Sequence, residues 1–319
     1  MTDFLRAPGL APKIFRFSDI DEFRSWIRNL NVDFTPLVRK IAAEQIILNL
    51  PGVAINSVKS FPRIIDAQLA PHCTAIGVTM DEGLPTRING VEQDQPFIMI
   101  GNNGAAYNAV EHVERQFAVI VFTPEVEDRS WPLAGPNFKI FQTSMLAQRR
   151  LRTLVKEILA VASGLVEEEL AAAAHGMRES LLAAVDAAFA DVVPAKWASH
   201  ANSVRQFQIF QAVREALSAN IAGPIYSRDL AKQLGLSVRT IHDAVLRYRG
   251  MSLHWYLRLR RLWLVRQRLR AGTHSVKAVA LAFGFWHLGD FSASYRIQFG
   301  EMPSDTLARS RGGSRGASS

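Results

Sequence analysis

The sequence predicts an α+β protein with a β-rich N-terminal domain and an all-α C-terminal domain. From about residue 44 to residue 122, short apolar runs are separated by Pro, Gly, Asn and Asp, a pattern typical of strands joined by turns. From residue 204 to residue 307 the pattern is helical, and glycines divide it into short segments. Residues 201–319 contain 18 Lys and Arg but 6 Asp and Glu, whereas residues 1–200 contain 19 and 23. The basic C-terminal part is therefore the one expected to meet a polyanion.

The length of 319 residues is enough for two domains, each with its own core. No stretch approaches the about 18–20 apolar residues of a membrane-spanning helix, and the first residues lack the apolar segment of a secretory signal. We therefore expect a cytoplasmic protein. The single cysteine, Cys73, excludes an internal disulfide and a zinc site built mainly from thiolates.

The first element predicted in the N-terminal domain is a helix over residues 19–30, with Ser18 as its N-cap. Its apolar face consists of Ile20, Phe23, Trp26, Ile27 and Leu30. The β-rich runs QIILNL, GVAINSV, TAIGVTM, TRINGV, PFIMIG and FAVIVF follow. Asn89-Gly90 predicts a hairpin turn, because both turn positions favour positive φ. These runs predict a small barrel or sandwich, and we expect residues 1–142 to form a barrel-like (cupin-like) domain.

A helical segment is predicted next. Residues 143–190 contain no proline and are rich in Ala, Leu, Glu and Arg, which favours one or two long helices. A polar stretch with Pro194 over residues 192–203 is interpreted as the linker. The predicted domains are thus 1–142, 143–200 and 201–310, and residues 311–319 are expected to be a disordered tail.

A weak internal repeat connects two parts of the C-terminal domain. A shift of 49 maps Leu230-Ala231 onto Val279-Ala280 and Gly235-Leu236 onto Gly284-Phe285, and a shift of 50 then maps Ile241, Val245 and Gly250 onto Phe291, Tyr295 and Gly300. Each copy predicts a short helix, a glycine turn and a second helix, with one extra residue in the second turn. The small residue lets the helices approach, the glycine permits a left-handed turn, and the apolar residue joins the helices, as a helix-turn-helix requires. Ser227 and Ser237 are the expected N-caps of the first copy.

A continuous helix over residues 252–270 is predicted to join the two copies. Its apolar stripe consists of Trp255, Leu259, Leu262 and Leu269. Nineteen helical residues span about 28 Å, close to the about 34 Å between successive major-groove openings on one face of DNA. Its arginines, Arg258, Arg260, Arg261, Arg266, Arg268 and Arg270, spread around the helix, so some are expected to be solvated charges. A protein-binding or purely structural helical module remains an alternative at this point.

The second copy, VKAVALAFGFWHLGDFSASYRIQFGEMPSDTL, resembles the AraC/XylS family of transcription regulators, and the resemblance covers roughly residues 205–308. The family's spacing is present as Ala280, Gly284-Phe285, Phe291-Ser292, Tyr295, Phe299-Gly300 and Pro303, with tyrosine where phenylalanine is usual. The resemblance implies a transcription factor that binds double-stranded DNA in a sequence-specific manner. It also implies RNA polymerase as a partner and activation as the usual direction of regulation.

The resemblance further implies a DNA-reading face on the second helix of each copy. The implied residues are Ser237, Arg239, Thr240, His242, Asp243 and Arg247 in the first copy, and His287, Leu288, Gly289, Ser292, Ala293 and Arg296 in the second. Arg239 suits a bidentate contact with guanine, or else a phosphate contact. The second set is poor in hydrogen-bond donors, which leaves phosphate contacts, contacts with thymine methyl groups and shape readout open.

The N-terminal half is similar to the effector-binding and dimerisation part of such regulators. The similarity implies a small-molecule effector of unknown identity, and a homodimer in which residues 143–200 supply the dimerisation segment. The residues expected to form the apolar wall of an effector-binding site are Ile98, Ile100, Phe117, Val119 and Val121. Simple core filling is the alternative for each of them.

An enzyme, or a DNA-modifying protein targeted by the helical module, is the alternative from another class. His72-Cys73 is the only adjacent thiol–imidazole pair, and neighbours in a strand point to opposite faces. His72 and His112 stand alone, without the His-x-His pair of a metal-binding cupin. The sequence therefore predicts no catalytic residue, no cofactor and no metal site.

Overall fold

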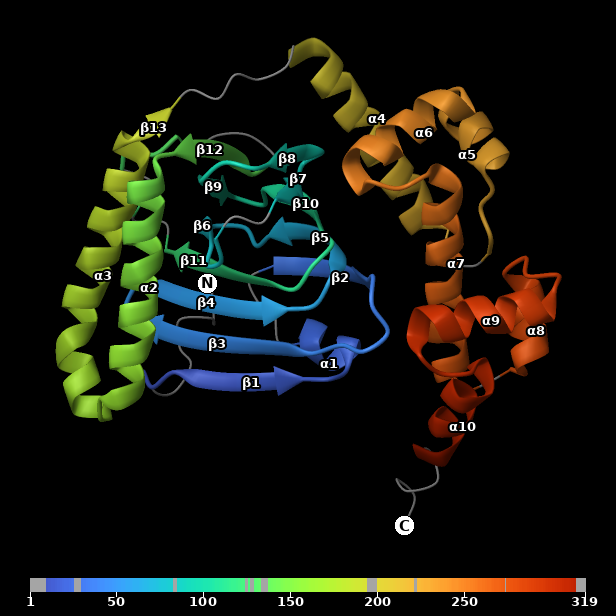
Figure 1. Cartoon of the computed structure of the whole chain (residues 1–319), viewed down its shortest axis with the longest axis horizontal. Helices are drawn as coiled ribbons and strands as arrows, with labels where there is room; N and C mark the ends of the chain where they lie inside the picture. The colour runs from blue at the N-terminus through green and yellow to red at the C-terminus, as the bar shows by residue number, and fades with distance from the viewer. Residues whose placement is uncertain are drawn as a thin grey trace. The chain divides into compact units, whose positions relative to one another are not determined.

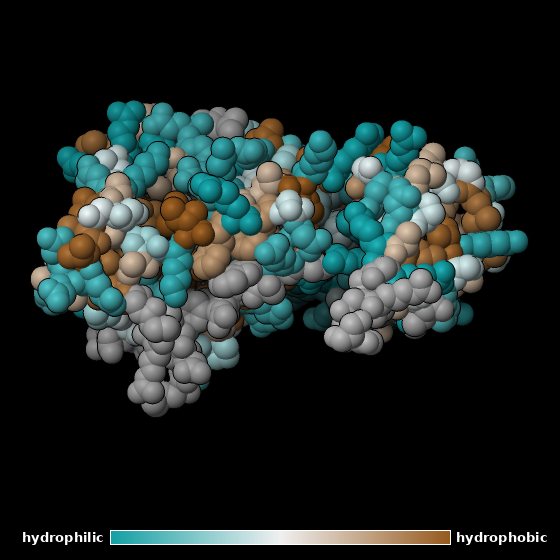
Figure 2. All heavy atoms as spheres, turned by 90° about the horizontal axis from the view of Figure 1, so that it is seen from below, coloured by the Kyte–Doolittle hydropathy of each residue, from teal (hydrophilic) through white to brown (hydrophobic). Residues whose placement is uncertain are grey.

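The computed structural model describes residues 10–25, 30–82, 85–123, 126, 129–132, 137–193, 200–220, 223–272 and 274–313. The chain divides into two compact units, one formed mainly by residues before 198 and the other mainly by residues from 198 onward (Figure 1). Within these residues no helix combines the length and the apolar character that crossing a membrane requires. On the face shown in Figure 2, hydrophobic residues form separate patches among hydrophilic ones in both units.

The N-terminal unit is built on two antiparallel sheets. The strands are β1 (Lys13–Phe17), β2 (Leu30–Pro36), β3 (Ala43–Leu50), β4 (Val53–Ser60), β5 (Arg63–Leu69), β6 (Thr74–Thr79), β7 (Thr86–Ile88), β8 (Val91–Gln93), β9 (Phe97–Asn102), β10 (Ala106–Glu111), β11 (Arg115–Phe122), β12 (Lys139–Thr143) and β13 (Val192–Val193). One sheet has the order β1-β3-β4-β11-β6-β9-β12-β13, and the other has the order β2-β5-β10-β7-β8. The predicted β-rich domain is confirmed. Neither sheet closes into a barrel among the strands described, because β1 and β13 remain edges of one sheet and β2 and β8 remain edges of the other.

The predicted hairpin at Asn89-Gly90 is confirmed. These two residues connect β7 to β8, and their φ angles are 49° and 75°. Two consecutive positive φ values belong to the type I′ turn, whose twist matches that of the flanking strands.

The first helix is shorter than predicted, and it is not the first element. Strand β1 precedes α1 (Ile20–Ser25), and β2 already begins at Leu30. Asp19, rather than Ser18, occupies the N-cap, where its Oδ1 accepts a hydrogen bond from the Glu22 amide at 3.2 Å. Residues 26–29 of the predicted helix lie outside the described residues. The prediction was wrong at Leu30 because strand pairing with β5 outweighs the helical spacing of the apolar residues.

Residues 143–190 form two helices, α2 (Met145–Gly164) and α3 (Glu167–Ala190), which lie side by side against one face of the eight-stranded sheet (Figure 1). Their buried residues share a core with alternate residues of the strands, including Ile76, Ile98 and Ile120. Trp131 belongs to this core and donates a hydrogen bond from Nε1 to Asp186 Oδ1 at 2.7 Å. In the predicted linker, residues 192 and 193 form β13 and residues 200–203 belong to the next helix, whereas 194–199 lie outside the described residues.

The C-terminal unit is helical over its described residues from 200 onward, as predicted. It contains α4 (His200–Ala219), α5 (Ser227–Leu234), α6 (Val238–Arg249), α7 (Leu253–Arg270), α8 (Val276–Ala282), α9 (Leu288–Phe299) and α10 (Pro303–Gly313). The first half of α7 contributes Leu253 and Leu257 to a core with α4, α5 and α6. Its second half contributes Leu262 and Leu269 to a core with α8, α9 and α10. Of the predicted disordered tail, residues 311–313 belong to α10 and residues 314–319 lie outside the described residues.

Substitution of Gly284 provides a test of the turn geometry in this unit. Its φ is 75°, and a Cβ at this position would overlap the hydroxyl oxygen of Tyr226. Gly235 has a similar φ of 64°, but a Cβ there would meet no atom within 4 Å. Gly235→Ala therefore isolates the cost of the left-handed backbone, about 1–2 kcal/mol. Gly284→Ala should cost at least about 1 kcal/mol more, because Tyr226 must also move. Equal losses of unfolding free energy in thermal denaturation would contradict this close packing.

Candidate nucleic-acid interface

The first helix-turn-helix consists of α5, a three-residue turn and α6. Gly235 adopts the left-handed conformation, and the Leu236 amide donates to the carbonyl oxygen of Ala231 at 3.0 Å. Ser237 is the N-cap of α6, as predicted, and its Oγ accepts from the Thr240 amide at 3.0 Å. Ser227 is the first residue of α5 rather than its N-cap, a position held by Tyr226 without a side-chain cap bond. The prediction for Ser227 was one residue late.

The second helix-turn-helix repeats this arrangement with α8 and α9. Gly284 is left-handed with φ 75°, and the Phe285 amide donates to the carbonyl oxygen of Ala280 at 2.9 Å. Phe291 is 1% exposed and occupies the place that Ile241, 0% exposed, takes in the first unit. From the turn glycine, α6 begins three residues later and α9 four residues later, so the predicted extra residue is present. The duplicated helix-turn-helix is confirmed.

The tyrosine that replaces the usual phenylalanine in the second unit has a hydrogen-bond partner. Tyr295 is fully buried, and its hydroxyl lies 2.8 Å from Oγ1 of Thr306 in α10. Thr306 in turn donates to Glu301 Oε1 at 2.7 Å. The substitution therefore adds a polar tie between α9 and α10, since a buried hydroxyl needs such a partner.

Of the six implied DNA-contacting residues of the first unit, three are exposed and three are half-buried. Ser237, Arg239 and Asp243 are exposed, whereas Thr240, His242 and Arg247 are half-buried at the margins of the exposed side of α6. The opposite side of the helix is buried and consists of Ile241, Ala244, Val245, Tyr248 and Arg249. The exposed side is thus free of core packing and presents a cation, a carboxylate and an imidazole together.

The exposed side of α9 has a different chemistry. Gly289, Ala293 and Arg296 are exposed, and Ser292 is half-buried. His287 is exposed at the N-cap of α9, where its side chain makes no capping bond. Leu288 packs against the core of the second unit, so its side chain belongs to the buried side.

Sequence reasoning missed one residue beside α9. Trp286 directly precedes the N-cap of the helix and is 71% exposed. Its neighbour Phe285 is buried in the core of the second unit. The signal was available in the sequence, since tryptophan is highly buried on average and here stands in the short turn between the two predicted helices.

Most arginines of α7 bond to or stack on other groups of the C-terminal unit. Arg258 donates to Ser294 Oγ of α9 at 2.5 Å, Arg260 donates to the carbonyl oxygen of Leu217, and Arg266 pairs with Glu301 at 3.4 Å. Arg268 and Arg270 are exposed. The predicted apolar stripe is correct for Leu259, Leu262 and Leu269 but wrong for Trp255, which is 42% exposed.

Arg261 of α7 connects the two helix-turn-helix units. Its guanidinium lies over the ring of Tyr226, at 5.2 Å, and over the ring of Phe285, at 5.1 Å. Tyr226 caps the first helix of one unit, and Phe285 follows the turn glycine of the other. Burial lowers the pKa of Arg261, and the nearby Tyr226 acts in the opposite direction. One cation therefore contacts an aromatic ring of each helix-turn-helix unit, and such contacts are stabilising.

The comparisons with known proteins concern this part of the chain. Residues 230–309 match the family model of a helix-turn-helix domain. XylDLEGF operon transcriptional activator 1 of Pseudomonas putida is 36% identical over 103 residues, which are 31% of this chain and 31% of the relative. A solved structure of a probable AraC family transcriptional regulator from Rhodopseudomonas palustris CGA009 is 37% identical, with 32% of this chain and 97% of that chain covered and a TM-score of 0.30. The C-terminal domain is an AraC/XylS-type helix-turn-helix domain.

The chain is also similar in sequence to a second transcriptional activator. HTH-type transcriptional activator RhaS of Salmonella schwarzengrund (strain CVM19633) is 33% identical over 89 residues, which are 28% of this chain and 32% of the relative. The chain thus spans about a third of the length of the curated relatives that it matches, 31% and 32% in these two cases. These relatives are named as transcriptional activators, not as enzymes.

Outside the AraC/XylS-type domain, the five candidate effector-binding residues are divided between the two faces of one sheet. Ile98 and Ile100 of β9 face α2 and α3 and belong to the buried core. In β11, Ala118, Ile120 and Phe122 belong to that core, so Phe117, Val119 and Val121 alternate onto the other face. The structure therefore does not bring the five residues to one surface.

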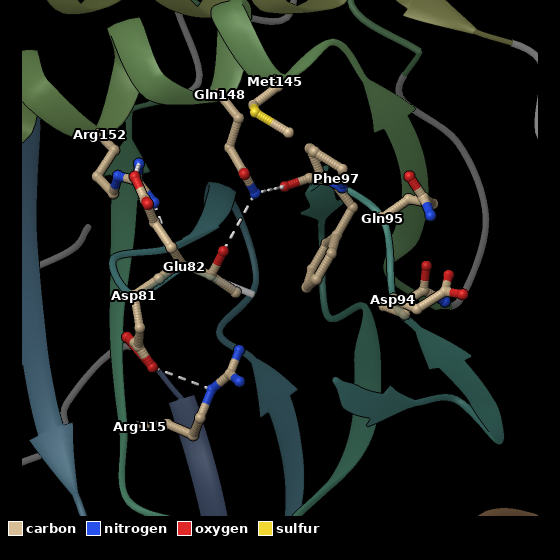
Figure 3. Close-up of a pocket in the computed structure, with 12 residues that line it drawn as sticks. Asp81, Glu82, Asp94, Gln95, Phe97, Arg115, Met145, Gln148 and Arg152 are labelled. Atoms are coloured by element: carbon tan, nitrogen blue, oxygen red, sulfur yellow. Dashed lines mark hydrogen bonds and ion pairs between the residues drawn. The ribbon is translucent and has the colours of Figure 1, made fainter. Parts of the chain in front are cut away.

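A polar pocket of about 280 Å³ lies where β6, β8, β9 and β11 meet the first turns of α2 (Figure 3). Its lining consists of Thr79, Asp81, Glu82, Gln93, Asp94, Gln95, Pro96, Phe97, Arg115, Met145, Gln148 and Arg152. Two of its walls carry ion pairs, one between Arg115 and Asp81 at 3.1 Å and one between Arg152 and Glu82. The pocket thus presents donors and acceptors side by side, and none of the five predicted wall residues lines it.

Gln148 shows how this pocket is held in shape. Its Nε2 donates to Thr79 Oγ1 at 3.1 Å and to the carbonyl oxygen of Phe97 at 3.0 Å (Figure 3). These bonds tie α2 to the ends of β6 and β9. The pocket therefore lies between the start of α2, the ends of strands and two segments that connect strands.

The geometry at Cys73 does not suit a nucleophile. Cys73 is buried, and burial raises the pKa of its thiol, which favours the unreactive protonated form. His72 lies in a turn with φ 59° rather than in a strand. Among the residues that the structure describes, no group of three or more His, Cys, Asp or Glu side chains is placed to hold a metal ion.

The role of Arg261 can be tested with Arg261→Met. Methionine keeps an apolar chain of similar length but loses both contacts between the cation and the rings, which should cost about 1–2 kcal/mol of unfolding free energy. Arg268→Met is the matched control, because Arg268 is exposed on the same helix, and it should change stability by less than about 0.5 kcal/mol. Hydrogen exchange across residues 274–300 gives the measurement. Equal protection in the two variants would show that Arg261 does not hold the units together.

Proposed function

We propose that this protein is a transcription regulator that binds specific sequences of double-stranded DNA through α6 and α9. The observation that carries the proposal is the pair of helix-turn-helix units, each with the side of its second helix opposite the core left exposed. A charge of 18 basic against 6 acidic residues over 201–319 supports a polyanionic partner. The matched relatives are named transcriptional activators, so activation is the proposed direction.

The dimensions of α7 suit two neighbouring major grooves. Its 18 residues span about 27 Å at about 1.5 Å each, and successive major-groove openings on one face of DNA are about 34 Å apart. In the first unit, Arg239 would donate to O6 and N7 of guanine, and Asp243 would accept from N4 of cytosine. Ser237, Thr240, His242 and Arg247 flank these two residues and supply further polar contacts, to bases or to phosphates. His287 and Arg296 would flank the second reading face in the same way.

The N-terminal unit is proposed to bind a small-molecule effector, and the polar pocket beside α2 is the proposed site. Its paired charges fit a small polar compound that both donates and accepts hydrogen bonds. Because α2 lines the pocket, a bound compound would stabilise one packing of α2 and α3 over another. A homodimer formed through residues 143–200, RNA polymerase as a partner and a cytoplasmic location complete the proposal.

Arg239→Ala tests the base-reading role in the full-length chain. If Arg239 grips a guanine, its loss should weaken binding to the selected sequence by about 1–3 kcal/mol and remove the preference at one base pair. Arg268→Ala is the control, since it removes an exposed arginine of the same unit that lies on neither reading helix. Random-sequence selection with each variant gives the measurement. A uniform loss of affinity for all sequences would assign Arg239 to the phosphate backbone instead.

Thermal denaturation with a panel of small metabolites tests the effector site. A compound that binds the folded N-terminal unit stabilises it by about 2.7 kcal/mol at a hundredfold excess over its Kd. Arg152→Met should abolish this stabilisation, while Arg150→Met, at an exposed position of the same helix, should preserve it. The compound should also alter DNA affinity and be recovered unchanged. Turnover of the compound that is lost in Cys73→Ala would instead support an enzyme.

A further inference from the structure

The reading faces of α6 and α9 differ at equivalent positions. With the shift of 50 residues that aligns the two helices, Gly289 takes the position of Arg239, and Ala293 takes the position of Asp243. All four residues are exposed. The first face thus carries a donor and an acceptor where the second carries a hydrogen atom and a methyl group. The second face therefore offers apolar contact rather than hydrogen bonds at its centre.

The glycine of this face is not required by the protein itself. A Cβ at Gly289 would meet no atom within 4 Å, and the residue lies in the first turn of a regular helix. Glycine in a helix costs about 1 kcal/mol relative to alanine, and no internal packing offsets that cost here. A glycine on an exposed face does, however, let the backbone approach a partner closely.

Trp286 adds a large apolar surface at the same end of α9. The residues on either side of it are hydrogen-bonded: the Phe285 amide donates to the carbonyl oxygen of Ala280 at 2.9 Å, and the carbonyl oxygen of His287 accepts from the Phe291 amide at 3.0 Å. The tryptophan side chain is nevertheless 71% exposed. An exposed indole beside a reading helix is available for contact with a partner.

Two polar side chains of α9, Ser294 and Tyr295, bond to groups of the protein, whereas Asp290 and Arg296 are exposed. Ser294 donates to the carbonyl oxygen of Asp290 at 2.6 Å and accepts from Arg258. Tyr295 is bonded to Thr306 in the interior. Ser294 and Tyr295 therefore add no free hydrogen-bonding group to the centre of the reading face.

We propose that α9 recognises thymine through its C5 methyl group, with Ala293 and Trp286 in contact with methyl groups and Gly289 permitting the close approach. The thymine methyl is the one apolar group that base pairs present in the major groove, and alanine is a known partner for it. This inference rests on the proposed function. It assigns hydrogen-bond readout to the first unit and methyl readout to the second.

Deoxyuridine substitution provides the test, since it removes the methyl group and leaves the hydrogen-bonding groups of thymine unchanged. The full-length chain is first used to select its preferred DNA, and each thymine is then replaced singly by deoxyuridine. The affected half-site should be the one whose preference is not altered by Arg239→Ala. One or two positions there should lose about three- to tenfold in affinity, the effect expected for one buried methyl group.

Ala293→Gly removes the matching methyl group from the protein. This variant should bind the thymine and deoxyuridine forms equally at one position, and Trp286→Ala should do so at another. Ala278→Gly, at an exposed position of α8, controls for the cost of glycine in a helix and should keep the full discrimination. Gly289→Leu should weaken binding without lowering the melting temperature, because the added side chain meets no protein atom.

The possible results distinguish methyl readout by α9 from sequence-specific DNA binding by the whole protein. Sequence-specific binding with the same affinity for every deoxyuridine form would overturn the methyl readout and leave the proposed function in place. Absence of sequence-specific binding would overturn both. Discrimination that persists in Ala293→Gly and in Trp286→Ala would also overturn the assignment to these residues.

Discussion

The arrangement of the C-terminal unit depends on α7, because this helix belongs to two hydrophobic cores at once. Leu253 and Leu257 complete the core of the first helix-turn-helix, and Leu262 and Leu269 complete the core of the second. A helix is stiff over this length, so the separation of the two cores follows from its rise per residue. Arg261 of the same helix adds a contact with a ring of each unit, Tyr226 in the first and Phe285 in the second. The spacing of the reading helices is thus a property of one continuous element.

The distribution of arginine shows why net charge is an incomplete guide to a nucleic-acid interface. Arg258, Arg260 and Arg266 of α7 bond to protein groups, and Arg249 of α6 is fully buried against the rings of Phe210 and Tyr256. The guanidinium group suits such places because it is planar and can stack on aromatic rings while donating in its plane. Some of the arginines therefore stabilise the helix-turn-helix domain, and the exposed arginines are available for contact with DNA.

In the N-terminal unit, an apolar residue in a strand does not by itself indicate a binding surface. Its strands alternate between a face covered by α2 and α3 and a face turned away from them, so neighbouring apolar residues of one strand have different surroundings. Ile98 and Ile120 serve the helix-covered core, whereas Val119 lies between core residues in sequence but on the other face. The pocket beside α2 instead collects charged and amide side chains from β8, β11, α2 and the segments between strands. The family model matches residues 230–309, and the curated activator described above matches 31% of this chain, so the proposed sensing role rests on the geometry of the N-terminal unit itself.

The sequence by itself determined the strand-rich first part, the two long helices and the duplicated helix-turn-helix, because these depend on periodicity and on local turn chemistry. The left-handed turns at Gly235 and Gly284 and the cap at Ser237 are local features of this kind. Only the tertiary structure decided which strands pair, which arginines turn inward and which residues line a pocket. It also ended α1 before Leu30, since pairing with β5 competes with helical spacing there. These outcomes depend on partners distant in the chain, and a single sequence carries no direct record of such contacts.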